Sequence, residues 1–436
     1  MHRLLLLLVC CSALSLTAQP TDRAALADSI RVILENGVGA KAFAGAQVLA
    51  WYQGAELVHV TAGHHTYAGE KVTRKDDLYD LASITKTTSG LLYLMQAYED
   101  GSLDLDAPLA DLFPGILRGE KGRRTLRSAL SHRAGLLPWV PYWQTTLRRQ
   151  AKYPWRKRWD ATVTNDYNFR RGTLRRDSTR RFPIRITDDL WLHRNFRQRW
   201  VERAIRKSPV KAEGNYAYSG LLFYLLPDFV ERRTGRDYRA YLRAEFYDPL
   251  GAATLGYRPL DRGYPLDRIV PTEVDTFFRM DTLHGVVHDE GAALMNGVSG
   301  NAGLFSTADD LAKLYQMLLN GGVYAGRRYF ADSTVRTFTS RHYAAEGNRR
   351  GLGFDKPLID YDAAASSVAR SASAASFGHS GYTGTLVWAD PERKLLFVFL
   401  SNRVHPTRLS REIYTMNIRP RVHQLLYDYL DSLPER

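Results

Sequence analysis

A serine and a lysine three residues apart form the most reactive pair in the chain. Ser83 and Lys86 stand in the run Ser-Ile-Thr-Lys, which precedes the apolar stretch 91–98. If this run opens a helix, the hydroxyl and the amine lie on one helical face, within hydrogen-bond reach. The positive end of a helix favours negative charge, so the hydroxyl should lose its proton more readily there. This pair suits acyl transfer through a serine ester.

The motif alone does not decide the matter. The same spacing recurs at Ser208 and Lys211, but Gly214 follows at once and no amphipathic helix develops. Ser83 also fits a serine that caps a helix, with a lysine on the helix surface. Further residues must therefore favour catalysis.

The run His379-Ser380-Gly381-Tyr382 offers a second part of such a site, directly before a predicted strand at 384–389. Active-serine enzymes bind the acyl group along an edge strand, which supplies one backbone N–H to the oxyanion hole. The run supplies the chemistry of a Lys-Thr-Gly triplet: a cationic or hydrogen-bonding side chain, a hydroxyl, and a residue without a Cβ that would block the substrate. A turn rich in Gly and Ser is the alternative interpretation.

A tyrosine would complete the site by relaying a proton to the leaving group. The candidate segment 215–220 contains Tyr216 and Tyr218. A tyrosine does this work only where a cation stabilises its phenolate, and Lys86 is the candidate cation. A rival relay is the run Ser299-Gly300-Asn301, which turn and capping chemistry before a helix near residue 307 also explains.

Both ends of the chain predict a β-hairpin beside a helix, and these elements must position the reactive residues. The N-terminal helix is expected at 21–35, with Thr21 or Asp22 as cap, and its apolar face consists of Leu26, Ile30, Ile33 and Leu34. The predicted strands are 46–51 and 57–61 at one end and 384–389 and 395–400 at the other, followed by a helix from about 408 to 433.

These elements predict an α/β (α+β) fold. One antiparallel sheet is built from both chain ends and flanked by the terminal helices. The middle, about 105–300, forms a mostly helical second lobe with a basic insertion. A cleft between the two lobes is the natural place for a site.

The first 18 residues predict a secretory signal peptide, with a basic start and an apolar run. We therefore expect a periplasmic or secreted protein, without a transmembrane anchor, in which 19–436 form one domain. Both cysteines, Cys10 and Cys11, lie in the signal. The mature chain then has no disulfide, thiol nucleophile or cysteine-bound metal.

Positive charge is concentrated in one segment. Residues 141–210 contain 19 Lys and Arg against 6 Asp and Glu, nearly all of the chain's net charge of +14. This segment either binds an anionic partner such as a cell-wall polymer or is a solvated insertion without a partner. Nucleic acid is a weaker choice because the signal peptide directs the protein away from it. Because it lies between Ser83 and Tyr218 in sequence, the segment should border the cleft.

The three elements, in this order, resemble the serine β-lactamase-like family: class C β-lactamases, penicillin-binding proteins, DD-peptidases and related esterases. The resemblance extends over nearly the whole mature chain. Further stretches that carry it are 130–136, 248–251, 300–307 and 377–390. The runs His288-Asp289-Glu290, 351–354 and 402–406 resemble most closely the serine-hydrolase domain found with family 3 glycoside hydrolases in Bacteroidetes.

The resemblance implies a role for each site residue. Ser83 is acylated, Lys86 activates it, Tyr218 relays the proton, and the backbone N–H groups of Ser83 and Tyr382 form the oxyanion hole. His379 replaces the usual strand lysine in a substrate-binding strand that includes Ser380 and Gly381. Two positions depart from the family pattern: Gly220 stands where the family has Asn in its Tyr-x-Asn motif, and Asn301 stands where close relatives often have His.

These residues predict a serine acyl hydrolase that acts through a covalent acyl-enzyme on an ester or amide. Cell-wall D-amino-acid peptides are the first substrate class, before carboxylic esters and β-lactams. The chemistry requires no metal and no organic cofactor. Two alternatives are a β-lactam or peptidoglycan sensor without turnover and a pseudoenzyme partner of a glycosidase. Retention of all three catalytic residues argues against the pseudoenzyme, and the oligomeric state is not predicted.

Overall fold

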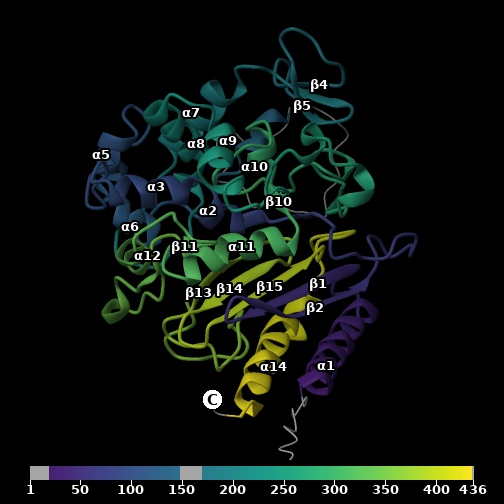
Figure 1. The fold of residues 1–436 in the computed structure, drawn as a ribbon. Coiled ribbons are helices and arrows are strands. Elements are labelled where there is room, and N and C mark those ends of the chain that lie inside the picture. Colours follow the sequence, from purple (N-terminus) through teal and green to yellow (C-terminus); the bar gives the residue numbers. More distant parts are fainter. Residues whose placement is uncertain (1–18, 148–168, 435–436) are drawn as a thin grey trace, which may run out of the picture.

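A five-stranded antiparallel sheet joins the two ends of the chain. The computed structural model describes residues 19–147 and 169–434, so the predicted signal peptide lies outside it. The strand order is β13-β14-β15-β1-β2. The strands are β13 (Phe377–Ser380), β14 (Leu386–Asp390), β15 (Leu395–Ser401), β1 (Gly45–Tyr52) and β2 (Ala55–Gly63). Figure 1 shows the N-terminal strands in purple beside the C-terminal ones in yellow, which confirms the sheet built from both ends.

The register of β1 explains how one strand serves two cores. Val48 pairs with Phe399 and Leu49 with Val398, all fully buried. Because successive side chains of a strand point to opposite faces, Val48 contributes to one hydrophobic cluster and Leu49 to the other. The β1–β2 turn is formed by Gln53 and Gly54, both with positive φ, as a tight hairpin requires.

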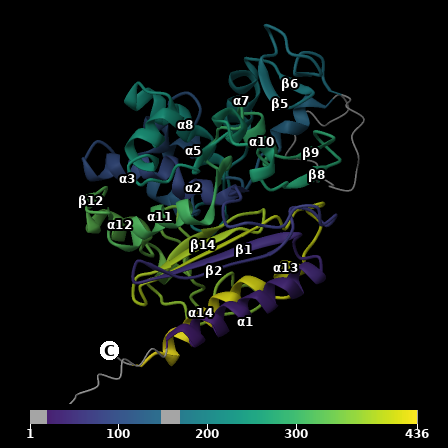
Figure 2. The ribbon, with the colours of Figure 1, turned by 45° about the vertical axis from the view of Figure 1, so that its right-hand side comes forward.

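Helices cover both faces of the sheet. The terminal helices α1 (Gln19–Gly39) and α14 (Ile418–Ser432) lie on one face, and α11 (Ala308–Leu319) lies on the other (Figure 2). The predicted apolar face of α1 is buried against the sheet, since Leu26, Ile30 and Leu34 belong to the same cluster as Val48. The second lobe lies beyond α11.

Two predicted helix boundaries are wrong. The first helix begins at Gln19, before the expected caps Thr21 and Asp22. The C-terminal helix does not begin near Arg408: a short helix α13 (Glu412–Thr415) precedes α14. Pro420 is the physical reason, since it lies in the first turn of α14, where a missing N–H costs nothing, and would interrupt a helix running from 408 to 433.

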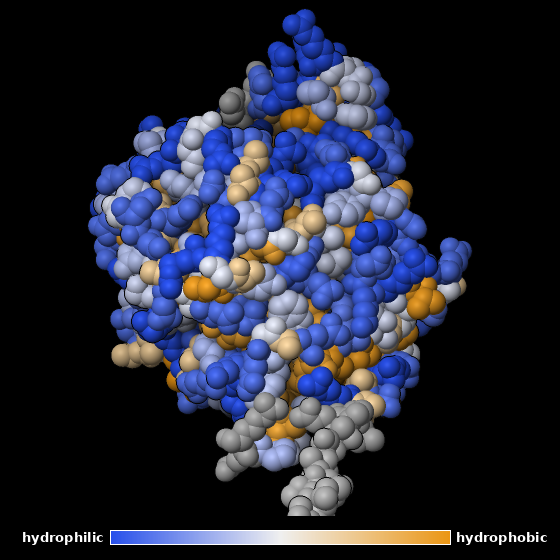
Figure 3. All heavy atoms as spheres, viewed as in Figure 1, coloured by the Kyte–Doolittle hydropathy of each residue, from blue (hydrophilic) through white to orange (hydrophobic). Residues whose placement is uncertain are grey.

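The second lobe is more mixed than predicted. Its helices include α3 (Gly90–Glu99) and α8 (Leu221–Thr234), and it also contains small antiparallel sheets. One of them, β4-β6-β5, consists of Leu174–Arg175, Leu190–Leu192 and Ile184–Thr187. This sheet lies within the basic segment, of which 148–168 fall outside the described residues. Hydrophilic side chains project at this end of the molecule (Figure 3).

A third short sheet leads to the predicted nucleophile. In it, β10 (Leu304–Ser306) lies between β3 (Tyr79–Asp80) and β7 (Gly256–Tyr257).

Along 19–147 and 169–434, no helix has the length and apolar character needed to cross a membrane.

Candidate active site

Ser83 stands on a tightly held turn between a strand and a helix. After β3 the chain forms a 3-10 turn, η1 (Ala82–Ile84), and then the short helix α2 (Thr85–Thr88). Ala82 has a φ of +45°, a conformation that residues with a Cβ rarely adopt. The side chain of Asp80 accepts a hydrogen bond from the Ala82 N–H at 2.8 Å, and Thr383 donates to the Asp80 carbonyl at 2.8 Å. These contacts hold strained backbone next to the nucleophile, as is frequent at functional sites.

Lys86 lies within hydrogen-bond distance of Ser83, as the spacing of the motif predicts. Its Nζ donates to Ser83 Oγ at 2.9 Å and to the Asn301 carbonyl at 3.1 Å, and the residue is only 2% exposed. No described carboxylate forms an ion pair with Lys86. The amine is therefore directed at the serine hydroxyl. The helix itself breaks at Ser89, before α3, which the apolar pattern did not predict.

Tyr218 approaches the same centre from the loop before α8. Its ring lies 4.6 Å from the His132 ring, and Lys86 Nζ lies 5.3 Å from the centre of the Tyr218 ring. The Tyr218 hydroxyl is buried and has no hydrogen-bond partner among the described residues. The amine of Lys86 thus faces the Tyr218 ring and forms no hydrogen bond with its oxygen. Tyr216, the other candidate, is 44% exposed.

The run His379-Ser380-Gly381 lies differently from what was expected. His379 and Ser380 belong to the edge strand β13 itself, one strand earlier than the predicted 384–389, which forms β14 from Leu386 onward. A Cβ on Gly381 would lie 2.6 Å from the Leu81 carbonyl oxygen, so this glycine lets the end of β13 pack against the nucleophile turn. None of the three residues lines the pocket beside Ser83.

His379 supplies no positive charge to the site. It is 3% exposed, and burial, with the nearby Arg350 guanidinium, lowers the pKa of His379 to about 3. The neutral ring donates from Nδ1 to the Ser380 carbonyl at 2.8 Å, so Nε2 can accept from Arg350 at 3.3 Å. The neutral ring therefore links the Ser380 carbonyl of β13 to the Arg350 guanidinium by hydrogen bonds.

Arg350 organises the floor of the catalytic centre and was not found from the sequence. Its guanidinium lies 3.4 Å from His132 Nε2 and forms an ion pair with Asp355 at 3.0 Å. Burial would raise the pKa of Asp355, but Arg350 and Arg349 outweigh it and lower this pKa to about 2. The only signal in sequence was that Arg350 directly precedes the run 351–354.

A cavity of about 380 Å³ opens beside Ser83. Five of the predicted site residues line it: Ser83, Lys86, Tyr218, Gly220 and Tyr382. Of the described residues of the basic segment, 141–147 and 169–210, none lines this cavity. Since residues 148–168 lie outside the described residues, the expectation that the segment borders the cleft stays a prediction. The cavity has room for the acyl group of a peptide or ester.

Two backbone donors beside the nucleophile have no hydrogen-bond partner in the described part of the chain. The N–H groups of Ser83 and Tyr382 donate no hydrogen bond to another described residue. The Tyr382 carbonyl is held by the Arg403 guanidinium at 2.6 and 3.0 Å, which fixes the strand end in place. Two fixed, unpartnered N–H groups match what an oxyanion hole requires.

Asn301 is a pocket residue that turn chemistry alone did not explain. Besides its carbonyl bond to Lys86, its side-chain Oδ1 accepts from the Ser299 hydroxyl at 2.6 Å. Gly220 caps α8 with a φ of −90°, and a Cβ there would lie 3.9 Å from the Cβ of Asn301. The Asn301 side chain therefore faces the space that a side chain at 220 would fill. The Ser-x-Asn pattern was the available signal.

The opposite wall of the cavity is a network of buried charges. Arg408 bonds Glu273 at 2.8 Å and forms an ion pair with Glu290 at 2.8 Å, while His288 Nε2 contacts Glu273 at 2.8 Å. Burial would raise the pKa of Glu273, but His288 and Arg408 outweigh it and hold this pKa well below its usual value. The sequence showed this wall only through the run His288-Asp289-Glu290.

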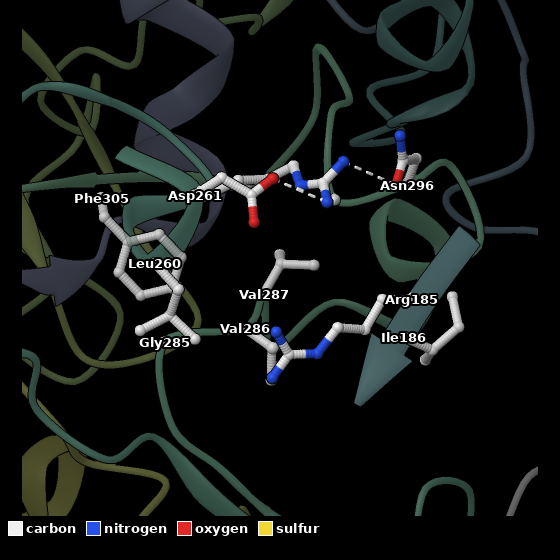
Figure 4. A pocket seen from close by; sticks show the side chains of 12 residues that line it. Arg185, Ile186, Leu260, Asp261, Gly285, Val286, Val287, Asn296 and Phe305 are labelled. Atoms are coloured by element: carbon white, nitrogen blue, oxygen red, sulfur yellow. Dashed lines mark hydrogen bonds and ion pairs between the residues drawn. The ribbon is translucent and has the colours of Figure 1, made fainter. Parts of the chain in front are cut away.

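A second pocket lies apart from the catalytic centre (Figure 4). It holds about 40 Å³ and shares no lining residue with the cavity beside Ser83. Its Arg258 already bonds Asn296 at 2.8 Å and pairs with Asp261 at 2.7 Å, as the dashed lines show. Because its charges are paired, we assign no site to it.

Comparison with known proteins places these features in context. The family model described as Beta-lactamase matches residues 30–416. An Escherichia coli (strain K12) protein named "Putative D-alanyl-D-alanine carboxypeptidase" is 30% identical over 347 residues, covering 75% of this chain and 69% of its own.

Two solved structures have the same fold. A penicillin-binding protein homologue from Caulobacter crescentus has a TM-score of 0.63 and 20% identity, with 94% of this chain and 98% of that chain covered. EstCE1, described as a hydrolase with promiscuous acyltransferase activity, has a TM-score of 0.63 and 18% identity, with 92% and 100% covered. The predicted combination of a terminal-strand sheet and a helix-rich lobe is confirmed.

Proposed function

Because the chain belongs to the beta-lactamase family and is a serine hydrolase of that family, we propose that it acts through an acyl-enzyme on Ser83. The first candidate substrate is a cell-wall peptide ending in a D-amino acid. One contact supports the proposal above all: Lys86 Nζ lies 2.9 Å from Ser83 Oγ, at a cavity with room for an acyl group.

Four residues that line the cavity have a role in the proposed reaction. Ser83 Oγ attacks the substrate carbonyl carbon and passes its proton to Lys86 Nζ. The N–H groups of Ser83 and Tyr382 stabilise the negative oxygen that develops. The proton reaches the leaving group through the Tyr218 hydroxyl, which is available because it has no hydrogen-bond partner among the described residues. Water then attacks the ester along the reverse proton path.

Asn301 takes part of the role that the missing side chain at 220 would have. Since its Oδ1 already accepts from Ser299, its Nδ2 remains as the donor toward the cavity. This donor binds the carbonyl of the substrate's acyl amide. The position of Asn301 opposite Gly220 supports this assignment.

The substrate class rests on two kinds of relatives. The name of the Escherichia coli relative points to D-alanyl-D-alanine peptides, and a family VIII carboxylesterase of the same fold, with a TM-score of 0.59 and 15% identity, points to esters. The peptide is favoured because the Escherichia coli relative, at 30% identity, is more similar in sequence than the carboxylesterase. A peptidoglycan substrate, like the predicted signal peptide, goes with a periplasmic or secreted location.

Intact-mass spectrometry tests the proposal. The protein is incubated separately with a fluorophosphonate, a penicillin and a depsipeptide ending in D-alanyl-D-lactate. We expect covalent labelling by the first two and turnover of the third. Stable penicillin labelling without depsipeptide turnover would favour the sensor, and labelling by none would favour the pseudoenzyme. Ser208→Ala is the matched control, since Ser208 shares the motif but lies at the end of α7 (Glu202–Lys207).

A further inference from the structure

Three side chains of the kinds that bind metal ions meet at the edge of the large sheet. They are Glu56 and His59 of the edge strand β2 and Asp309 in the first turn of α11. One possible ligand atom from each residue lies within 4.8 Å of the other two. None of the three residues lines the cavity beside Ser83. The cluster is therefore separate from the candidate active site.

A β-bulge places the two strand residues on the same face of the sheet. Residues three apart in a regular strand point to opposite faces. The pairing of β1 with β2 shifts after Ala50, so Leu57 is an extra residue in β2. Leu57 and Val58 are both buried in the hydrophobic cluster that contains the apolar face of α1. Glu56 and His59 therefore both point to the opposite face, which α11 covers.

Hydrogen bonds orient the ring of His59 for metal binding. Its side chain is only 1% exposed. Gln47 Nε2 donates to the Asp77 carbonyl at 3.3 Å, so Gln47 Oε1 is left as an acceptor and lies 3.2 Å from His59 Nε2. The ring therefore carries its proton on Nε2, and Nδ1 keeps a lone pair. Metal-binding histidines are held in this way, with the far N–H donated to an oxygen behind the ring.

The lone pair of His59 Nδ1 faces carboxylates rather than a donor. Glu56 Oε2 lies 4.0 Å from Nδ1, too far for a hydrogen bond, and no other described residue donates to this nitrogen. The Asp309 carboxylate forms no hydrogen bond and no ion pair along 19–147 and 169–434. Lys75 lies 3.8 Å from Glu56 Oε1, on a side chain that is 57% exposed. A lone pair beside two carboxylates is repulsive unless a cation lies between them.

We propose that Glu56, His59 and Asp309 bind a divalent transition-metal ion of the zinc type. An imidazole ligand favours Zn²⁺ over Mg²⁺, which prefers oxygen ligands. Three protein ligands leave a fourth position for water, on the side where Glu56 is 48% exposed. The ion links the edge strand β2 to the start of α11 and stabilises the folded protein. It takes no part in the proposed acylation of Ser83.

Isothermal titration calorimetry with Zn²⁺ tests this inference on the full chain, after treatment with a chelator and removal of any affinity tag. We expect one saturable Zn²⁺ site and no binding of Mg²⁺ at the same concentration. Zn²⁺ at about 100 times its Kd should raise Tm by about 3 °C, because the ion binds only the folded protein. Absence of Zn²⁺ binding would overturn the inference, and so would Mg²⁺ binding of equal affinity, since it would exclude His59 as a ligand.

Two variants locate the bound ion. Asp309→Asn and Glu56→Gln should each weaken Zn²⁺ binding by at least ~100-fold, the upper range for loss of a residue that only supports a ligand. Without Zn²⁺ they should keep Tm within about 2 °C, because each removes one carboxylate at nearly constant size. The matched control is Asp111→Asn in the first turn of α4 (Leu109–Leu112), outside the cluster, which should keep the affinity. Zn²⁺ binding that survives both cluster variants would place the ion elsewhere and overturn the inference.

Discussion

The two walls of the cavity differ in how their buried polar groups are paired. On the Arg408 wall, Glu273 and Glu290 each have a charged partner within 3.0 Å. On the catalytic wall, the Tyr218 hydroxyl and the N–H groups of Ser83 and Tyr382 lack partners among the described residues. Leaving a buried polar atom unpaired costs about 1–3 kcal/mol, so such atoms accumulate where a ligand will pair them.

The backbone follows the same division. Strain is found on the catalytic wall, at Ala82, whose positive φ is maintained by Asp80 and Thr383. The contrast indicates that the ion pairs around Arg408 mainly stabilise the fold, whereas the unpartnered groups beside Ser83 are available to a substrate. Substitutions on the two walls should therefore affect different measurements.

The largest effect is expected from Ser83→Ala. Loss of the nucleophile should abolish fluorophosphonate labelling and hydrolysis, while the free energy of unfolding changes by no more than about 1 kcal/mol. Mass spectrometry and urea denaturation measure the two effects. Label found on Ser208 in the unmodified protein would show that Ser83 is not the nucleophile.

Arg408→Ala should damage stability most. It leaves Glu290 buried without its ion-pair partner and Glu273 with His288 alone, and breaking a buried ion pair costs about 3–5 kcal/mol. Urea denaturation measures the loss. The control is Arg243→Ala, whose pair with Asp248 is exposed and should be worth at most about 1 kcal/mol. Similar losses in both variants would remove the distinction between the walls.

Lys86→Ala and Tyr218→Phe should each lower the hydrolysis rate by at least ~100-fold, the lower range for a lost general acid or base. The double variant should lose little more, because the two residues act as one proton path. Tyr218→Phe removes a hydroxyl that has no partner in 19–147 and 169–434, so stability should hardly change. Tyr216→Phe is the control, and additive losses in the double variant would separate the two roles.

Acid should lower the free energy of unfolding in two stages, through His379 and Asp355 behind the catalytic centre. The pKa of His379 is about 3 in the folded protein, below its usual value, so its contribution to stability falls as pH drops below about 6.5. Asp355, with a pKa near 2, contributes stability above about pH 4, worth about 2 kcal/mol, and loses it between pH 4 and 2. Asp355→Asn should flatten the second stage in urea denaturation at several pH values. An unchanged slope would contradict this role for Asp355.

Gly220→Asn should give the smallest effect. The backbone at Gly220 has a negative φ and the nearest atoms to a new Cβ are 3.9 Å away, so the side chain fits. An added amide should shift kcat/KM from a nitrophenyl ester toward a chromogenic cephalosporin by about tenfold, the value of one charged hydrogen bond. Efficient cephalosporin turnover by the unmodified protein would mean that Asn301 already supplies the missing amide in full.

The sequence by itself determined the local geometry of the site. Ser83 and Lys86 are one helical turn apart, so their contact at 2.9 Å depends on few torsions and could be predicted. The two terminal hairpins were likewise readable, because alternation of apolar residues and turn residues act within a few positions. The resemblance to a family added Tyr218, Tyr382 and Gly220, which do line the cavity.

Only the tertiary structure decided which side chains surround that pair. Asn301 reaches Lys86 across 215 positions, and Arg408 reaches Glu273 across 135. No local pattern encodes such contacts, since they depend on how the lobe packs on the sheet. The same holds for the hydroxyl of Tyr218, which has no hydrogen-bond partner among the described residues. Whether a polar atom is partnered depends on all of its neighbours, so this hydroxyl could be identified as an available group only in the folded structure.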